Sequence, residues 1–320
     1  MADELRVGIV GFGGMGQGHA RNVSQVDGME LVAISDPSDQ AQGKAAEFGA
    51  SAYGDYRRMI EDAEPGAIIV SSPSNTHGEV VKHCCEIGLP VFCEKPLTTS
   101  LSEAVEVRDL VRSTGNKFSI GLVLRHSDVY QDARMMVGEG RIGEVGMADC
   151  RYSGHMLGRY HYVFSKELGR GLINEHTIHM IDVMEYILGP VCQVFAVTDA
   201  CPEHTEYNAS ILMTHEGGAS TAISASGVSR QPGFARITGM EGEIFIEKNR
   251  RLVVSDENGE TEIVSAELGY RRELEDFRDT ITDDQVPHTG IEEAFNSARL
   301  IEAIYRSAES DEIVKPDDLD

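Results

Sequence analysis

The sequence lacks any long hydrophobic run. No stretch approaches the roughly 20 apolar residues that a membrane-spanning helix needs. A signal peptide is also not expected, because the charged start "MADELR" leads directly into the strand-like "VGIVGFG". Both absences predict a cytoplasmic protein with no membrane partner.

Cysteine is scarce and scattered. The chain has 6 cysteines and no CxxC pair, which argues against a disulfide framework and against a zinc knuckle. Cys84 and Cys85 are adjacent, and we interpret them as reduced, half-buried residues of one helix.

Basic residues are few. The chain carries 28 Lys and Arg against 53 Asp and Glu, a net charge of -25. A nucleic-acid backbone would be repelled, so nucleic acid is excluded as a partner. Lysine is rarer than arginine, and abundant carboxylates with little lysine keep a surface hydrated in concentrated salt. A high-salt cytosol is therefore one hypothesis, and an ordinary acidic protein is the alternative.

A chain of 320 residues is long for a single core and favours two domains. Up to about Val123, short apolar runs alternate with helical patterns. This alternation predicts a parallel, doubly wound Rossmann sheet over residues 1–123. The expected strands are "LRVGIV", "ELVAISD", "AIIVSS", "PVFCEK" and "KFSIGLV".

Residues 124–320 follow a different pattern. A helix capped by Ser127 and ending near Gly138 precedes the strand "EVGMADCRYSG" and a second helix. From Val191 to about Ile263, short alternating runs follow each other without helices, which predicts a largely antiparallel open sheet. Two helices follow, starting near residues 268 and 291. The free face of this α+β domain suits a homodimer or homotetramer.

A glycine fingerprint joins the first expected strand to the first helix. Gly11 permits a tight turn, Gly13 lets the backbone approach a pyrophosphate, and Gly16 lets the helix lie close to the sheet. Asp36 ends the second strand about twenty residues later, where a carboxylate accepts hydrogen bonds from the adenosine ribose. No arginine follows it, so NAD is favoured over NADP. The residues expected to bind the cofactor here are Gly11, Phe12, Gly13, Gly14, Met15, Gly16 and Asp36.

Two further stretches, "SSPSNTHG" and "EKP", follow later strands at the carboxyl edge, where doubly wound sheets bind ligands. Lys95 interrupts an apolar strand end, and its ammonium group is suited to steadying negative charge on a substrate oxygen. The further residues predicted to contact the cofactor are Ser72, Pro73, Asn75, His77, Glu94 and Lys95.

These motifs, with "EGRIGEV", "GRGLINEHTIHMID" and "AIYRSAES", resemble in order the glucose-fructose oxidoreductase / inositol dehydrogenase (Gfo/Idh/MocA) family. The resemblance implies that Lys95 and His179 act at the substrate, helped by a carboxylate four residues before the histidine. That position holds Glu175 where the family usually has Asp, and Thr177 stands where a glycine is usual.

An α-helical period places Glu175 and His179 on one stripe, which Asp182 and Tyr186 extend. His176 falls about a quarter turn away. Because imidazole titrates near neutrality, His179 is the predicted base that takes a hydroxyl proton, and Glu175 is expected to orient it.

The segment before this helix is rich in His, Tyr, Arg and Gly and is a candidate sugar-binding lining. The residues predicted to contact substrate are Lys95, Arg125, His155, Arg159, Tyr160, His161, Glu175, His176 and His179. A zinc site formed by Glu175, His179, His155 and His161 is an alternative. Because HExxH and clustered cysteines are missing, we expect no metal.

The sequence therefore predicts an NAD-dependent dehydrogenase acting on a secondary hydroxyl of a sugar, inositol or related polyol. Two alternatives stay open. One is a non-catalytic dinucleotide-binding regulator, and the other is an enzyme that recycles bound NAD internally for glycoside cleavage or hydride exchange between substrates.

Overall fold

The computed structural model describes residues 4–156, 161–200 and 204–319. The chain divides into two compact units. Unit 1 comprises Met1–Gly121 and Tyr270–Phe295, and unit 2 comprises Leu122–Gly269 and Asn296–Asp320. Within the described ranges, no helix is long and apolar enough to cross a membrane.

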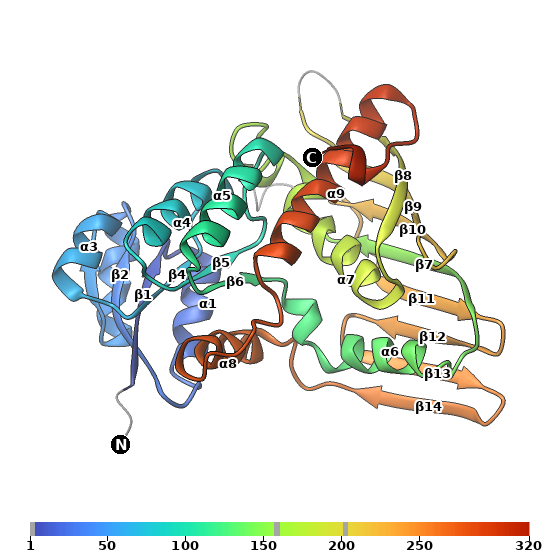
Figure 1. The fold of residues 1–320 in the computed structure, drawn as a ribbon, viewed down its shortest axis with the longest axis horizontal. Helices are drawn as coiled ribbons and strands as arrows, with labels where there is room; N and C mark the ends of the chain where they lie inside the picture. Colours follow the sequence, from blue (N-terminus) through green and yellow to red (C-terminus); the bar gives the residue numbers. More distant parts are fainter. Residues whose placement is uncertain (1–3, 157–160, 201–203, 320) are drawn as a thin grey trace. The chain divides into compact units, whose positions relative to one another are not determined.

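Unit 1 contains a six-stranded parallel sheet in the order β3-β2-β1-β4-β5-β6 (Figure 1). β1 pairs with both β2 and β4. Strands β2 and β3 therefore lie on one side of β1 and strands β4 to β6 on the other, as in a Rossmann fold. The expected fold class is confirmed here. The strands are β1 (Leu5–Val10), β2 (Met29–Ser35), β3 (Ser51–Tyr53), β4 (Ala67–Val70), β5 (Val91–Glu94) and β6 (Phe118–Gly121).

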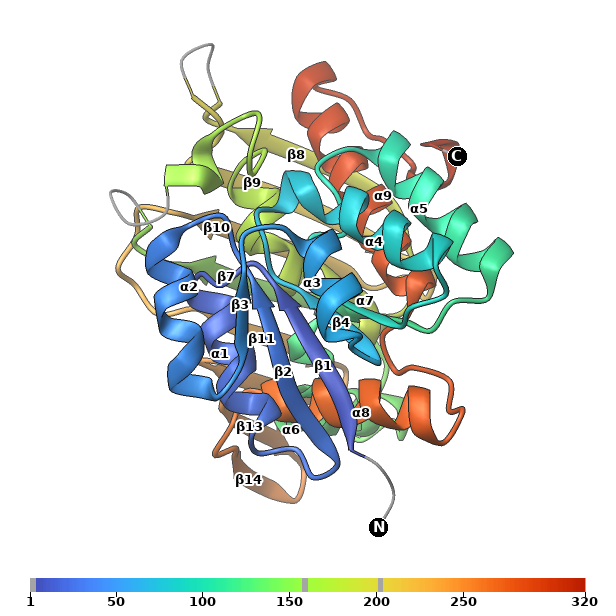
Figure 2. The ribbon, with the colours of Figure 1, turned by 90° about the vertical axis from the view of Figure 1, so that its left-hand side faces the viewer.

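Helices cover both faces of this sheet (Figure 2). Helices α1 and α8 contact each other, as do α4 and α5. Local signals explain their ends: α5 starts where the Ser100 hydroxyl accepts the Glu103 N–H, and it stops at Gly115 in the left-handed region. The helices are α1 (Gly14–Val23), α2 (Asp39–Ala45), α3 (Tyr56–Ala63), α4 (His77–Glu86), α5 (Leu101–Thr114) and α8 (Tyr270–Thr282), with 3-10 turns η1 (Ala46–Phe48) and η2 (Ser74–Thr76).

Helix α8 belongs to unit 1 although it lies far along the chain. Leu274 and Phe277 are fully buried in the same core cluster as Ile9 and Phe92. The rings of Phe92 and Phe277 lie 5.8 Å apart. A single boundary near residue 123 therefore does not describe the two units, because the apolar face of α8 completes the core of the first.

Unit 2 contains an eight-stranded sheet in the order β14-β13-β12-β11-β7-β10-β9-β8. All neighbouring pairs are antiparallel except β10 and β7, so the expectation of a largely antiparallel sheet is confirmed. The strands are β7 (Val145–Ser153), β8 (Val191–Thr198), β9 (Asn208–His215), β10 (Ser220–Ser226), β11 (Phe234–Gly239), β12 (Gly242–Glu247), β13 (Arg251–Asp256) and β14 (Gly259–Val264).

Helices lie over one face of this sheet (Figure 1), and the other, here called the open face, carries exposed side chains along the described strands. Along β9, Ile211 and Met213 are buried while Ser210, Leu212 and Thr214 are exposed, the alternation of a sheet covered on one side. The helices are α6 (Asp128–Gly138), α7 (Ile178–Leu188) and α9 (Ile291–Ser310), whose first residues belong to unit 1. Short turns are η3 (Val123–His126), η4 (His161–Phe164), η5 (Ile173–Thr177) and η6 (Pro316–Leu319).

Three local expectations need correction. The short strand β3 was not predicted, because three residues give too little periodicity. The run "ARITGMEGEIFIEK" forms two strands, β11 and β12, joined by a tight turn at Met240 and Glu241. Gly239 ends β11, and a Cβ there would lie 2.1 Å from the Ile142 carbonyl oxygen. Ser127 occupies the N-cap position of α6, but its side chain makes no capping hydrogen bond.

Candidate dinucleotide and substrate sites

The turn between β1 and α1 has the backbone of a phosphate-binding loop. Gly11 has φ +88°, and a Cβ there would lie 2.4 Å from the Ser72 backbone, so only glycine fits. A Cβ at Gly16 would lie 2.1 Å from the Gly11 carbonyl oxygen. Nothing lies within 4 Å of a Cβ at Gly13 or Gly14. The turn is therefore closed on its protein side and open on the side where an anion would approach the start of α1.

Asp36 lies beside this turn. Its Oδ2 accepts the Phe12 N–H at 2.7 Å and its Oδ1 accepts the Ser38 N–H at 2.8 Å. The Phe12 side chain is buried edge-to-face against Phe48, so its ring belongs to the core. Asp36 is half-buried and keeps lone pairs available for ribose hydroxyls.

The loop after β4 is held by His77. Its Nδ1 lies 2.8 Å from the Pro96 carbonyl oxygen and its Nε2 lies 2.9 Å from that of Ser72. Burial lowers the pKa of His77, while its hydrogen bonds with the two carbonyl oxygens oppose that shift. The histidine ties the loop containing Ser72, Pro73 and Asn75 to the one that follows β5.

The end of β5 carries Glu94 and Lys95. Glu94 turns inward, and its Oε1 lies 2.7 Å from His19 Nε2 in a buried pair. The Lys95 backbone N–H donates to Glu94 Oε2 at 3.2 Å, and the Lys95–Pro96 peptide is cis. Lys95 itself is partly exposed and directly follows β5, at the carboxyl edge of the sheet.

In unit 2, the segment with the two histidines starts from a buried carboxylate. Glu206 Oε1 accepts the Ile173 N–H at 2.8 Å and the Tyr305 hydroxyl at 2.9 Å. Gly171 has φ +132°, and a Cβ there would lie 2.4 Å from Glu206 Oε2. Glycine at this position lets the carboxylate reach the first turn, which fixes where the helix begins.

The expected regular helix starts instead with a π-helical turn, η5, which contains Glu175 and His176 and passes into α7 before His179. π-helical turns often occur at functional sites. The ring of Tyr152 on β7 lies 4.4 Å from that of His176 and 6.3 Å from that of His179. The α-helical period had assigned the two histidines to different faces of the helix. The wider turn instead places both of them against one tyrosine.

Further along α7, the expected polar stripe is not solvent-facing. Asp182 is 1% exposed and forms a bidentate ion pair with Arg125, with distances of 2.7 to 3.1 Å. The Arg125 guanidinium also lies 5.0 Å from the Tyr186 ring. Arg125 therefore holds η3 against α7. Glu175 is also buried, at 6% exposure.

The segment predicted to line a sugar pocket is described only in part. His155 is exposed, with Nδ1 at 3.3 Å from the Val228 carbonyl oxygen. Arg159 and Tyr160 lie outside the described residues. His161 starts η4, but its side chain lies outside the description as well.

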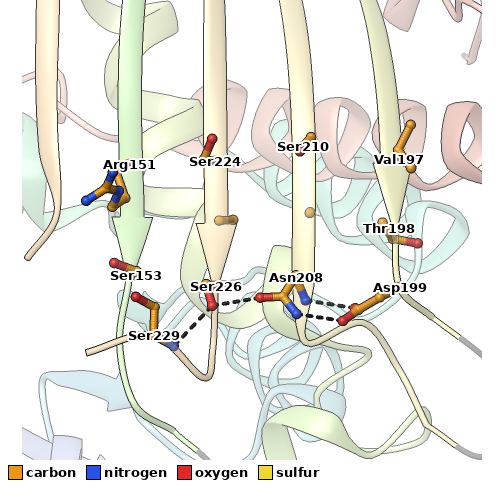
Figure 3. Close-up of a pocket in the computed structure, with 12 residues that line it drawn as sticks. Arg151, Ser153, Val197, Thr198, Asp199, Asn208, Ser210, Ser224, Ser226 and Ser229 are labelled. Carbon is orange, nitrogen blue, oxygen red and sulfur yellow. Dashed lines mark hydrogen bonds between the residues drawn. The ribbon is translucent and has the colours of Figure 1, made fainter. Parts of the chain in front are cut away.

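A separate hollow of about 440 Å³ lies on the open face of the unit 2 sheet (Figure 3). There the Ser226 hydroxyl donates to Asn208 Oδ1 at 2.7 Å, and Asn208 Nδ2 donates to Asp199 Oδ2 at 2.6 Å. These polar groups satisfy one another. Of the residues that the sequence predicted for a site, none is among those lining this hollow.

The sequence did not indicate three residues of these sites: His19, Tyr152 and Glu206. Each reaches its partner across a long separation in the chain, and no local spacing identifies such pairs. The one available signal was Gly171, because a glycine directly before a helix marks an unusual backbone conformation.

Comparisons with known proteins place the chain among oxidoreductases. The family model "NAD-binding Rossmann fold" matches residues 5–122, and "C-terminal alpha/beta domain" matches residues 134–315. The scyllo-inositol 2-dehydrogenase (NAD(+)) of Bacillus subtilis (strain 168) is 29% identical over 268 residues, which are 77% of this chain and 75% of that protein. Inositol 2-dehydrogenase 2 of Paenarthrobacter aurescens (strain TC1) is 26% identical, covering 96% of this chain and 97% of its own.

The fold has a close match among solved structures. An oxidoreductase from Agrobacterium radiobacter, crystallised with NAD+, L-tartaric acid and magnesium, superposes with a TM-score of 0.90 at 21% identity over 99% of each chain. The predicted Rossmann fold and NAD cofactor are thus confirmed by the matching models. The chain belongs to the Gfo/Idh/MocA family of oxidoreductases.

Proposed function

We propose that the protein oxidises a secondary hydroxyl group of a sugar, inositol or related polyol with NAD. Membership of an NAD-binding oxidoreductase family supports the reaction class. The names of the relatives, which include inositol 2-dehydrogenases, support the substrate class.

His179 is assigned as the base that accepts the proton of the hydroxyl group. Imidazole accepts a proton near neutral pH, and a positioned base contributes about a hundredfold or more to the rate of such steps. The Tyr152 ring packs against both His176 and His179, which limits the orientations of the two imidazoles. His176 is assigned to substrate contact beside the base.

Lys95 is assigned as the residue that stabilises negative charge on the substrate oxygen. Bound NAD supplies the acceptor for the hydride that leaves the carbinol carbon. As the hydroxyl proton departs, negative charge builds on the oxygen, and the Lys95 ammonium stabilises it by charge and by hydrogen bonding. Pairing with His19 and the Lys95 N–H draws the Glu94 side chain inward, away from this role.

Glu175 is assigned to orient the imidazole of His179. It lies in the π-helical turn, its N–H donates to the Gly171 carbonyl oxygen, and it is buried. Arg125 of η3 and Asp182 of α7 form an ion pair with each other, and Glu175 is the carboxylate directly before His176 in the sequence. Arg125, His155, Arg159, Tyr160 and His161 remain predictions as substrate contacts.

One observation carries the proposal most: the π-helical turn and the first residues of α7 bring two histidines to one tyrosine, in a chain whose other unit has an NAD-binding fold. The test follows NADH absorbance with a panel of inositols, aldoses and sugar acids, at low and high salt. At least one polyol should reduce NAD. If none does and NAD still binds, the chain is a regulator; tightly held NAD without net NADH would indicate internal recycling.

The open face of the unit 2 sheet is proposed as a contact between copies of this chain. Val197 and Leu212 project from it and are each 52% exposed, and exposed apolar residues on such a face favour association. Light scattering should show a dimer or tetramer for the native chain and a smaller species for Leu212→Glu. A native monomer would refute this contact.

A further inference from the structure

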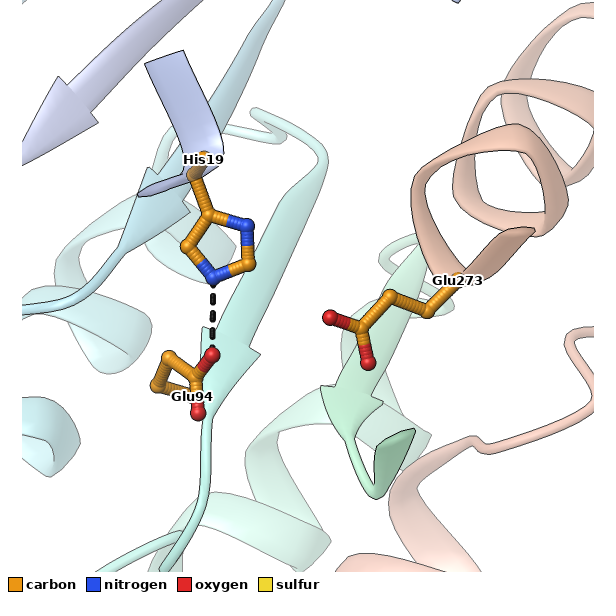
Figure 4. Close-up of side chains that lie close together, drawn as sticks. All are labelled: His19, Glu94 and Glu273. Atoms are coloured by element: carbon orange, nitrogen blue, oxygen red, sulfur yellow. Dashed lines mark hydrogen bonds and ion pairs between the residues drawn. The ribbon is translucent and has the colours of Figure 1, made fainter. Parts of the chain in front are cut away.

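Unit 1 contains a buried cluster of three ionisable side chains. His19 comes from α1, Glu94 from the end of β5 and Glu273 from α8 (Figure 4). One nitrogen or oxygen atom from each lies within 4.8 Å of the other two. Their exposed fractions are 0% for His19, 5% for Glu94 and 1% for Glu273.

Glu273 is the unusual member of this cluster. Neither of its carboxylate oxygens has a hydrogen-bond partner among the described residues. Figure 4 shows this carboxyl group directed towards Glu94 and His19, which are already paired with each other. A buried carboxylate without a partner is costly, so something is expected between Glu273 and the pair.

A proton on Glu273 answers only part of this requirement. Burial and the nearby charge of Glu94 raise the pKa of Glu273, so a proton would remove its charge. The neutral acid would still leave one buried donor and at least one acceptor unsatisfied. An atom that bridges Glu273 to His19 and Glu94 would satisfy the oxygens and the charge together.

We propose that His19, Glu94 and Glu273 bind a divalent transition-metal ion of the Zn²⁺ or Mn²⁺ type. Two carboxylates balance the charge of such an ion, and one imidazole favours it over Mg²⁺ or Ca²⁺, which prefer oxygen ligands. Ligands about 2.0–2.2 Å from Zn²⁺ lie at most about 4.4 Å apart. Donor atoms within 4.8 Å therefore close round one ion after small side-chain movements.

The site would be structural. It would tie α8 to α1 and β5, and the core of unit 1 already depends on α8. It lies in unit 1 and shares no residue with the zinc set Glu175, His179, His155 and His161 that the sequence raised as an alternative. The site does not depend on the proposed reaction.

The test uses the full-length native protein. Chelator-treated protein is dialysed and then titrated with Zn²⁺ or Mn²⁺ alone, with bound metal measured by mass spectrometry and heat of binding by calorimetry. About one ion per chain is expected. Loss of a direct ligand in Glu273→Gln or His19→Gln should weaken binding by at least about a hundredfold.

Glu185→Gln is the matched control. Glu185 is a buried carboxyl group of unit 2 that accepts hydrogen bonds from the Asn296 side chain and the Val191 N–H, so the same chemical change is made in the other unit, outside the cluster. Its metal binding should equal that of the native chain.

The native chain decides the matter even if a cluster variant fails to fold. Added metal should raise the melting temperature of the stripped protein, because the ion binds only the folded state. The proposal would be overturned if the reloaded protein held less than about one tenth of a metal ion per chain and its melting temperature did not change. Equally tight binding by folded Glu273→Gln would overturn it as well.

Discussion

At the scale of single residues, the chemistry is assigned to two side chains, the ammonium group of Lys95 in unit 1 and the imidazole of His179 in unit 2. Lys95→Ala and His179→Ala should each reduce turnover by at least about a hundredfold, because each removes a group that acts on the developing charge or the proton. NAD affinity, measured by fluorescence titration, should change little.

Lys82→Ala is the matched control for Lys95. Lys82 lies on α4 of the same unit and pairs at the surface with Glu103 and Glu106, so its removal should leave turnover unchanged. Near-native turnover in Lys95→Ala or His179→Ala would remove that residue from its proposed role.

Asp36 is expected to set the preference for NAD. Its carboxylate would accept ribose hydroxyls and repel a 2'-phosphate. Asp36→Ser should weaken NAD binding by about ten- to a hundredfold, the range for a lost charge-assisted hydrogen bond. NADP binding should improve relative to NAD. An unchanged ratio of the two affinities would show that the cofactor preference arises elsewhere.

Residues that act through local motifs were predictable, and residues that act through distant partners were not. Gly11, Gly16 and Asp36 follow from a spacing that the turn itself requires. Tyr152 and Glu206 gain their importance from contacts with a helix elsewhere in the chain. Nothing in the neighbouring sequence of either residue indicates such a contact.

At the scale of elements, two glycines of the turn between β1 and α1 are expected to have different roles, one in stability and one in NAD binding. Gly11→Ala places a Cβ into the Ser72 backbone at a positive φ, so it should destabilise the protein by about 1–3 kcal/mol or more in urea unfolding. Gly13→Ala meets no protein atom and has an ordinary φ of -69°.

Gly13→Ala should therefore keep native stability and lose NAD affinity, because its new methyl group occupies the side that the dinucleotide approaches. Calorimetric titration with NAD measures this directly. If Gly13→Ala binds NAD like the native chain, the dinucleotide does not lie against the open side of the turn.

The π-helical turn shows where helical periodicity fails. The segment 173–177 reads as the start of a regular helix, and residue spacing alone gives an α-helical wheel. Its actual start is fixed by Gly171 and Glu206, which lie outside the pattern. The relative placing of His176 and His179 could therefore not be predicted from the sequence.

Glu206 should make stability depend on pH. Burial raises its pKa in the folded state above the ordinary value of about 4.3. The folded chain therefore binds this proton more tightly, and the associated stability is present at low pH and is lost as pH rises towards the raised pKa. Glutamine has no such proton to lose, so the melting temperature of Glu206→Gln should rise relative to that of the native chain as pH increases above about 4.3.

Glu302→Gln is a control with the opposite sign. Burial opposes the charge of Glu302, but hydrogen bonds from Arg170 and Arg306 lower its pKa overall. Its stabilising effect is present above the ordinary carboxyl pKa and is lost as pH falls through the lowered one. Glu302→Gln should therefore lose stability relative to the native chain as pH rises. Parallel melting curves for both variants would contradict the two assignments.

At the scale of the whole molecule, the alternation of short runs was enough to predict two kinds of sheet. Buried parallel strands such as β4 and β5 read as continuous apolar runs, and β9 alternates as a half-covered strand does. The return of α8 to unit 1 was not predictable, since its apolar face would fit any core.

The acidic surface makes a prediction for the whole chain. With a net charge of -25, mutual repulsion should weaken the folded state at low ionic strength. Raising KCl from about 0.1 M to about 1 M shortens the screening length from about 10 to 3 Å, and the melting temperature should rise by at least about 5 °C. Full folding and activity without added salt would refute adaptation to high salt.

The most direct test of the central claim follows the hydride itself. A polyol that reduces NAD is deuterated at its carbinol carbon, and the cofactor is analysed by mass spectrometry after one turnover. One deuterium should appear in the reduced cofactor with the native chain, and at least about a hundredfold more slowly with His179→Ala. A reduced cofactor without deuterium, or equal rates for both proteins, would contradict the account.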